Sequence, residues 1–199
     1  MLFALLLIFF SLQDSVQPTI EAVTLNLQKK FNYKKNHSFL LVNIEKQEMY
    51  LVKNDSIKKT YRISSSKYGT GNKSGSEKTP LGVHRIAEKI GANAEPNTIF
   101  VGRVDTRKEA SIITDTLDVE ADDVTSRILW LEGLEPGINK GKGIDSHERY
   151  IYIHGTPEEG LIGTPASHGC IRMHNSEVIE LFNIVATGTF VVIEERVEY

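Results

Sequence analysis

The sequence predicts a mainly β domain of the α+β class. Three observations support this fold class. Many short segments rich in β-branched and aromatic residues are separated by polar turns, only two segments have helical periodicity, and strands do not alternate regularly with helices. The length of 199 residues suits one domain with its own core, and no internal repeat or linker divides it.

Residues 1–18 begin with the apolar run MLFALLLIFFSL, which is shorter than the about 20 residues that a helix needs to span a bilayer. We therefore expect a secretory signal segment and an exported protein of the periplasm or cell envelope. No lysine or arginine precedes the run and no small-x-small cleavage site follows it, so cleavage stays open. A buried N-terminal helix or strand is the alternative.

Residues 19–37 are expected to form a helix and a lead-in to the main domain. The helix covers residues 19–31, which have a capping-type start and apolar residues at helical spacing. A second helix is expected over residues 176–185, with Asn175 or Ser176 as its N-cap. The expected strands cover residues 39–44, 47–52, 56–63, 83–88, 98–104, 127–132, 150–154 and 189–194. The remaining long segments are loops at residues 67–78 and 133–146 and an irregular polar stretch at residues 91–123.

The composition excludes several classes of function. Lysine and arginine total 23 and aspartate and glutamate total 26, so the net charge of 23 − 26 = −3 gives no basic face for nucleic acid. Cys170 is the single cysteine, which excludes an intrachain disulfide framework and a multi-thiolate zinc site. A lone cysteine can still act as a nucleophile. No oligomeric state follows from these features.

The residues with the most distinctive chemistry lie between positions 150 and 175, in the stretch YIYIHGTPEEGLIGTPASHGCIRMHN. Side chains alternate between the two faces of a strand, so Tyr152 and His154 are expected on one face. If residues 167–173 are also extended, three more side chains share a face: His168, Cys170 and Arg172. The two segments would then converge if they lie side by side, because the glycines and prolines between them allow the chain to turn.

This set of residues suits acyl transfer by a thiol. A free thiol has a pKa of about 8.5, so a histidine such as His154 at a cleft wall would take the proton of Cys170 and return it to the leaving amine. Gly169 has no Cβ, which lets the backbone bend so that its amides point at a developing oxyanion. Arg172 would hold a substrate carboxylate through two hydrogen bonds.

Each residue also has a structural alternative. Cys170 could be a small buried hydrophobe, Arg172 could pair with an acidic neighbour, and Tyr152 could be ordinary packing. A zinc site is the alternative for a set of four residues: His154, His168, Cys170 and His174. Three further histidines are expected at the surface: His37, His84 and His147.

At these positions the sequence resembles the L,D-transpeptidase family of bacterial cell-wall enzymes. The family signature is a histidine, then roughly a dozen and a half residues, then Ser/Thr-His-Gly-Cys, with arginine or asparagine two residues later. Here these are His154 and the run from Ser167 to Arg172, SHGCIR. Residues 78–82 (KTPLG) are similar to an upstream element of the family. The resemblance covers about residues 38–194 and implies a β-sandwich catalytic domain over residues 38–199, with residues 91–146 as a loop or cap insertion.

The resemblance implies a role for each residue of the motif. Cys170 would be the nucleophile, His154 the proton acceptor and donor, and His168 a supporting catalytic residue, with the Gly169 and Cys170 backbone forming the oxyanion hole. Four further residues are assigned to substrate binding: Arg172, Tyr152, Ser167 and Gly155. No cofactor or metal is implied, because thiol acyl transfer needs none.

The substrate implied by the resemblance is a peptidoglycan tetrapeptide stem. Cys170 would form a thioester with the third residue, release D-alanine and pass the acyl group to an amine of a neighbouring stem. Related family members use a lipoprotein, a D-amino acid or water as acceptor, so a cysteine hydrolase or amidase acting on stems or stem-attached protein is the alternative. A further alternative is a non-catalytic module that binds the cell wall. Carbapenems are the expected inactivators.

Overall fold

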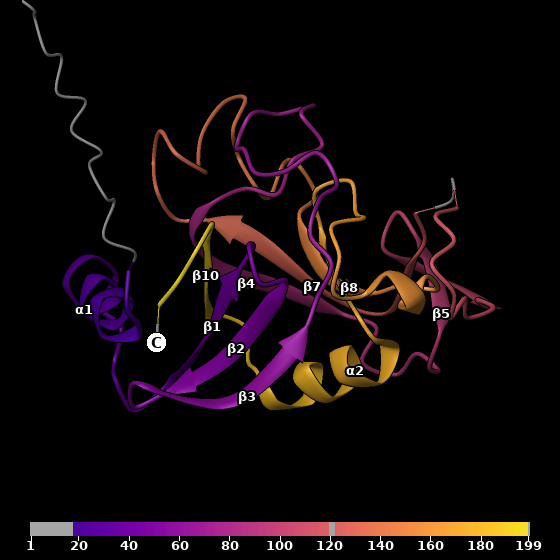
Figure 1. Cartoon of the computed structure of the whole chain (residues 1–199), viewed down its shortest axis with the longest axis horizontal. Helices are drawn as coiled ribbons and strands as arrows, with labels where there is room; N and C mark the ends of the chain where they lie inside the picture. Colours follow the sequence, from indigo (N-terminus) through magenta and orange to yellow (C-terminus); the bar gives the residue numbers. More distant parts are fainter. Residues whose placement is uncertain (1–17, 120–121, 199) are drawn as a thin grey trace, which may run out of the picture.

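The computed structural model describes residues 18–119 and 122–198 (Figure 1). Within these ranges the chain forms ten strands, two α-helices and one short 3-10 helix, which confirms the mainly β prediction. The expected signal segment lies almost wholly outside the described residues. Among those described, no helix is long and apolar enough to cross a membrane.

The strands form one sheet with the order β3-β2-β1-β10-β4-β7-β5-β6, and it branches at β7, where β8 pairs with β7 and β9 pairs with β8. Their bounds are β1 Ser38–Asn43, β2 Glu48–Lys53, β3 Ser56–Arg62, β4 Gly82–Ile90, β5 Thr98–Val101, β6 Val104–Glu109, β7 Val124–Gly133, β8 Tyr152–Gly155, β9 Ile171–Met173 and β10 Phe190–Glu194. Most pairs are antiparallel, but β1 with β10 and β8 with β9 are parallel. The branch places apolar side chains of β8 and β9, such as Ile153 and Ile171, in the same core cluster as those of β1.

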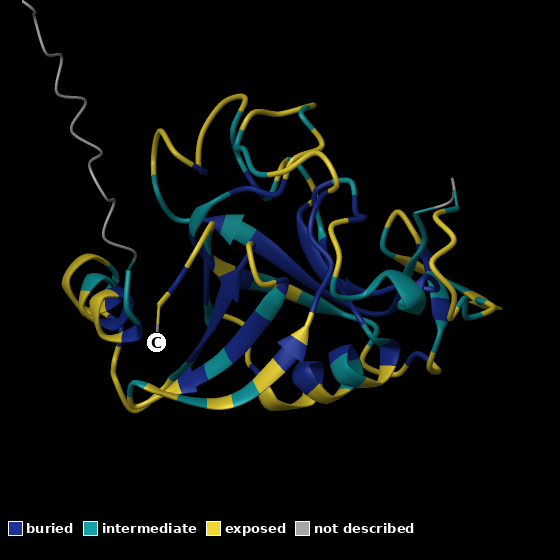
Figure 2. Cartoon of the chain, viewed as in Figure 1, coloured by how far each residue is buried: buried dark blue, intermediate teal, exposed yellow. Residues whose placement is uncertain are grey.

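The two helices cover opposite faces of the central strands. Helix α1 (Ile20–Phe31) packs against alternate residues of β1 that include Phe39 and Leu41, whereas α2 (Asn175–Ile184) packs against Leu40 and Val42. Figure 1 shows the two helices on different sides of the strands, and Figure 2 shows that β1 is buried between them. Because both faces are covered, residues 39–42 of β1 are all apolar and do not alternate with polar residues.

Both helices agree with the sequence analysis, apart from one cap. Helix α1 begins after Thr19, whose side chain accepts a hydrogen bond from the amide of Ala22 at 3.3 Å. The N-cap of α2 is His174, one residue before the predicted Asn175, and its side chain makes no capping bond. The side chain of Asn175 instead accepts hydrogen bonds from Thr125 and Ser126 and so joins the helix to β7.

The single strand expected over residues 98–104 is wrong, because a hairpin occupies this region. Strand β5 ends at Val101 and β6 begins at Val104, which leaves Gly102 and Arg103 as a two-residue turn. Their φ values of 53° and 70° are those of a turn with two left-handed residues. The sequence did not predict this turn because arginine is not a residue that favours a left-handed conformation.

His84 is fully buried, so the expectation that it lies at the surface is wrong. Its Nδ1 contacts the carbonyl oxygen of Gly82 at 3.0 Å and its Nε2 contacts Oγ of Ser146 at 2.9 Å. The pKa of His84 is lowered to about 4, mainly because burial disfavours the charged imidazole. The neutral imidazole therefore links β4 to the end of the 133–146 loop.

This burial makes stability depend on pH. Between pH 6.5 and 4 the unfolded chain binds a proton at His84 that the folded chain does not bind, so the free energy of unfolding decreases as the pH falls. We expect His84 to account for a loss of about 3 kcal/mol across this window. Urea unfolding at pH 7.5 and 4.5 checks it: over this range the pH-dependent loss in His84→Gln should be smaller than in the wild type by about 2.5 kcal/mol. An unchanged loss in the variant would contradict the assignment.

Candidate active site

Strands β8 and β9 bring the two parts of the sequence motif together. They are parallel, with Ile153 opposite Ile171 and His154 opposite Arg172, so Cys170 lies beside Tyr152 just before β9 begins. The Sγ atom of Cys170 accepts a hydrogen bond from the amide of Tyr152 at 3.3 Å and donates one to the carbonyl oxygen of Tyr150 at 3.4 Å. The predicted convergence of the histidine strand and the cysteine segment is thus confirmed at the level of the backbone.

Residues 167–173 are not one extended run, contrary to expectation. Only Ile171–Met173 forms a strand, because Gly169 has a φ of 123° and the chain bends at residues 168–170. His168, Cys170 and Arg172 therefore do not share a strand face. The bend turns Cys170 toward β8 while the guanidinium of Arg172 points into the protein.

The thiol of Cys170 is partly buried and not ionised at neutral pH. Burial raises its pKa to about 12, although the Tyr152 amide and the charges of Arg172 and Arg149 act in the opposite direction. The thiol contacts backbone polar groups on one side, which distinguishes it from a cysteine packed as a plain hydrophobe. Ionisation of this thiol at neutral pH would therefore require a base.

His154 is suited to be that base, although its placement differs from the expected cleft wall. The residue is buried, with 1% of its surface exposed, because β8 lies between β7 and β9. Its Nδ1 lies 2.7 Å from the carbonyl oxygen of Gly155, which can only accept, so Nδ1 carries the proton and Nε2 has the free lone pair. Burial lowers the pKa of His154, which keeps the ring neutral at physiological pH.

Asp122 is a site residue that the sequence analysis missed. Its carboxylate binds Nδ1 of His168 at 2.8 Å and the guanidinium of Arg172 at 2.5 and 2.9 Å. Burial alone would raise the pKa of Asp122, but the electrostatic interaction with His154, the charge of Arg172 and the hydrogen bonds from His168 and Arg172 outweigh it and lower the pKa. No local pattern marks Asp122, since it lies in the irregular stretch 91–123 and far from its partners in sequence.

The assignment of Arg172 to substrate binding needs correction. Its side chain is fully buried and its guanidinium is occupied by Asp122 on one side and by Glu158, at 2.9 Å, on the other. The alternative of an acidic neighbour is therefore the one that the structure supports. The buried guanidinium of Arg172 therefore neutralises the carboxylates of Asp122 and Glu158 inside the protein.

Ser167 and Gly155 are also placed inside the protein and not at a substrate surface. Ser167 is fully buried, and its hydroxyl donates to the carbonyl oxygen of Cys170 at 2.6 Å and accepts from the amide of Gly169 at 3.3 Å. A Cβ on Gly155 would lie 2.4 Å from Oδ1 of Asn175, so this glycine allows close packing. Both residues hold the backbone around Cys170 and His154, which corrects their assignment to substrate binding.

The remaining assignments concern the oxyanion hole, His168 and Tyr152. The Gly169 amide already donates to Ser167, whereas the oxyanion role of the Cys170 amide stays a prediction. The imidazole of His168 is partly exposed beside Asp122, and the ring of Tyr152 is largely buried with its hydroxyl bound by Arg103 at 3.2 Å. Both the packing role and the substrate role of Tyr152 are therefore compatible with its position.

The zinc alternative is not supported by the geometry. Across the part of the chain that the structure describes, no three histidine, cysteine, aspartate or glutamate side chains are placed to hold a metal ion. Two of the four residues proposed for it use a ring nitrogen elsewhere, His154 on Gly155 and His168 on Asp122. His174 lies instead 3.4 Å from Glu159.

Arg149 is a second missed residue, a cation whose charge acts on the thiol of Cys170. Its guanidinium donates to the carbonyl oxygens of Gly71 at 3.1 Å and Lys78 at 2.5 Å, and its charge lowers the pKa of Cys170. It therefore joins the 67–78 loop to the site. Arg149 directly precedes Tyr150, where the distinctive stretch of sequence begins, and this position could have drawn attention to it. Its partners, however, are backbone carbonyl oxygens, which no sequence motif indicates.

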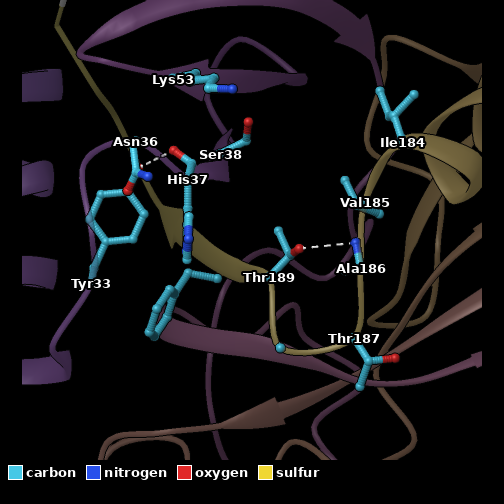
Figure 3. A pocket seen from close by; sticks show the side chains of 12 residues that line it. Tyr33, Asn36, His37, Ser38, Lys53, Ile184, Val185, Ala186, Thr187 and Thr189 are labelled. Carbon is cyan, nitrogen blue, oxygen red and sulfur yellow. Dashed lines mark hydrogen bonds between the residues drawn. The ribbon is translucent and has the colours of Figure 1, made fainter.

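Figure 3 shows a pocket elsewhere in the molecule, where the lead-in residues Tyr33 to Ser38 face the segment from Ile184 to Phe190. None of its lining residues belongs to the site around Cys170. The chemistry is therefore not located in this pocket.

The high pKa of Cys170 predicts slow alkylation of the free protein. At pH 7.5 we expect iodoacetamide to modify the folded chain at least about tenfold more slowly than the same chain unfolded in urea, since the unfolded thiol has a pKa of about 8.5. Mass spectrometry of timed samples gives both rates, with Cys170→Ser as the unlabelled control. Faster labelling of the folded chain would show that Cys170 and His154 already form an ion pair.

Comparisons with known proteins give matches to one protein family. The YkuD family profile, described as the L,D-transpeptidase catalytic domain, matches residues 37–193. YqjB of Bacillus subtilis, assigned by name to the L,D-transpeptidases, is 48% identical over 54 residues, 27% of this chain and 30% of that protein. YkuD of Bacillus subtilis, named in the same way, is 58% identical over 46 residues, 23% of this chain and 28% of that protein. The matched segments thus span less than a third of these relatives.

Two solved structures are also among the matches. The L,D-transpeptidase of Xylanimonas cellulosilytica has a TM-score of 0.48 and 17% identity, covering 87% of this chain and 69% of that one. The catalytic domain of the Enterococcus faecium L,D-transpeptidase has a TM-score of 0.47 and 19% identity, covering 81% of this chain and 100% of that one. Because the family profile covers most of the chain and includes His154 and Cys170, this protein belongs to the L,D-transpeptidase catalytic-domain family.

Proposed function

We propose that this protein is a peptidoglycan L,D-transpeptidase with Cys170 as its nucleophile. The observation that carries the proposal is the neutral thiol of Cys170, held by the backbone of Tyr150 and Tyr152 at the start of the strand that contains neutral His154. Because the thiol of Cys170 does not ionise by itself, it has to transfer its proton to a base when it attacks. The buried ring of His154, on the neighbouring strand, is such a base. Acyl transfer fits this requirement.

The proposed reaction has two halves. Sγ of Cys170 attacks the carbonyl carbon of the third residue of a tetrapeptide stem while Nε2 of His154 takes the thiol proton. The tetrahedral oxyanion collapses, the C–N bond breaks, and D-alanine leaves with the proton from His154. An acceptor amine then attacks the thioester, His154 takes a proton from that amine, and Sγ regains it as the acceptor amide forms.

The acceptor decides which member of the family this is. An amine of a second stem gives a cross-link, a lipoprotein amine gives an attached protein, a D-amino acid gives exchange, and water gives a shortened stem. We propose the cross-link as the main outcome, with hydrolysis as the second candidate because both share the same thioester. We also propose export to the periplasm or cell envelope, where these stems occur.

The experiment is to incubate purified protein with tetrapeptide muropeptides and to separate the products by liquid chromatography and mass spectrometry. Dimers with loss of D-alanine support transfer, and shortened monomers support hydrolysis. Cys170→Ser is the matched control and should give neither product. A protein that consumes no tetrapeptide and forms no covalent adduct with meropenem would overturn the proposed function.

A further inference from the structure

The tip of the β5–β6 hairpin carries an arginine where the backbone disfavours one. Gly102 and Arg103 form the two-residue turn, and Arg103 has a φ of 70°. Such turns favour asparagine, aspartate and glycine because other side chains clash with the backbone in this region. At Arg103, contacts of the side chain compensate for the cost of this conformation.

The side chain of Arg103 lies on a group of rings that we call the aromatic platform, made of Trp130, His147, Tyr150 and Tyr152. The guanidinium carbon lies 4.5 Å from the ring centre of Trp130 and 5.1 Å from that of Tyr150, and Nη1 donates to the hydroxyl of Tyr152 at 3.2 Å. The ring of His147 stacks on Trp130 at 3.9 Å with planes 4° apart. The platform therefore fixes the plane of the guanidinium.

The aromatic platform adjoins the nucleophile. The carbonyl oxygen of Tyr150 and the amide of Tyr152, two members of the platform, are the groups that contact Sγ of Cys170. One tyrosine side chain thus links the guanidinium of Arg103 to the peptide beside the thiol.

The charge of Arg103 is available to a ligand. Among the described residues no aspartate or glutamate forms an ion pair with Arg103, and the charge of Glu88 acts on it only at longer range. By contrast, Arg172 binds two carboxylates and Arg85 binds Glu132. The guanidinium is partly exposed, and its flat face is occupied by the rings while hydrogen-bond donors remain at its edge. Two exposed apolar side chains flank it, Val101 at 65% and Val104 at 68% exposure. A carboxylate next to a small apolar group suits this surface.

We propose that Arg103 binds the terminal carboxylate of the donor peptide, the one carried by the amino acid that leaves. This inference rests on the proposed function, because it assigns the substrate group that the arginine recognises there. Arg103 thus takes the carboxylate-binding role that was expected for Arg172, whose side chain is buried. The protein then prefers donor peptides that end in a free acid to those that end in an amide.

The test compares two donor tetrapeptides, one with a free C-terminal carboxylate and one with a C-terminal amide. Wild-type protein should use the acid roughly 10- to 100-fold better by kcat/KM, the effect of a hydrogen bond to a charged group. Arg103→Asn should bring this ratio close to one. Asparagine suits the left-handed turn, so the variant keeps the hairpin.

Arg107→Asn is the matched control. Arg107 lies on the same hairpin, is exposed and has a φ of 56°, but it is not part of the contacts with the platform. Its variant loses the same charge and should keep the wild-type ratio of acid to amide. Arg103→Lys should give an intermediate ratio, since an ammonium keeps the charge and loses the planar fork.

The outcomes separate this inference from the proposed function. If Arg103→Asn keeps the wild-type ratio, or loses both substrates equally, Arg103 does not bind the terminal carboxylate although the function stands. If wild-type protein uses both donors equally, the inference is also overturned. If wild-type protein uses neither donor, the proposed function fails and the inference fails with it.

Discussion

Replacement of His154 by alanine is expected to reduce the rate at which Cys170 is acylated by about 10²- to 10⁴-fold, the usual contribution of a general base. The reason is the thiol, whose pKa of about 12 leaves almost no thiolate at neutral pH without proton removal by Nε2. The measurement is the rate of covalent adduct formation with meropenem, followed by mass spectrometry of the intact protein.

His154 is buried, so its loss also removes packing and the hydrogen bond to Gly155. His154→Gln is therefore the second variant, because its amide can donate to Gly155 without acting as a base. Circular dichroism melting should show a folded protein for at least this variant, and its adduct should form as slowly as with alanine. Wild-type acylation by His154→Gln would contradict the role of His154 as base.

The second large effect is expected for Arg172→Met. This change leaves buried Glu158 and partly buried Asp122 without their shared cation, and breaking one partner of a buried ion pair costs about 3–5 kcal/mol of the free energy of unfolding. Urea unfolding followed by circular dichroism measures the loss. The matched control is Arg85→Met, whose pair with Glu132 is exposed and should contribute about 0–1 kcal/mol.

The catalytic effect of Arg172→Met should follow from this structural role. Acylation by meropenem and turnover of the tetrapeptide should fall by similar factors, because both depend on the placement of Cys170 and neither contacts Arg172. If the methionine variant does not fold, Arg172→Lys should still be less stable than the wild type, since lysine cannot bridge both carboxylates. A larger loss for the peptide than for meropenem would restore Arg172 as a substrate-binding residue.

Much of the fold followed from local patterns. Strands and helices with clear periodicity were predicted within a few residues, and the spacing of His154 and Cys170 was sufficient to expect that they converge. The hairpin at residues 98–109 was missed because its turn lacks the usual residues, so Arg103 was not recognised. Local sequence does not encode a turn that is held by contacts with distant rings.

The errors at the site have a common physical cause. Arg172 was placed at the surface of the cleft because its partner, Asp122, lies 50 positions away in a segment without periodicity. His154 was expected at a cleft wall because the branch of the sheet at β7, which covers it, depends on long-range pairing. Burial and ion pairs between remote segments are properties of the tertiary structure, whereas the motif describes only neighbours in sequence.

The parallel pairing of β8 with β9 has a consequence for how such an enzyme can diversify. The relative position of base and nucleophile depends on the hydrogen bonds between two strands and not on the length of the connection between them. Thr164 and Pro165, in that connection, are exposed. Changes at these exposed positions can alter which molecules approach the thiol, while the relative position of His154 and Cys170 stays the same. The connection between β8 and β9 can therefore vary and change substrate choice, while the paired strands on either side of it keep the chemistry constant.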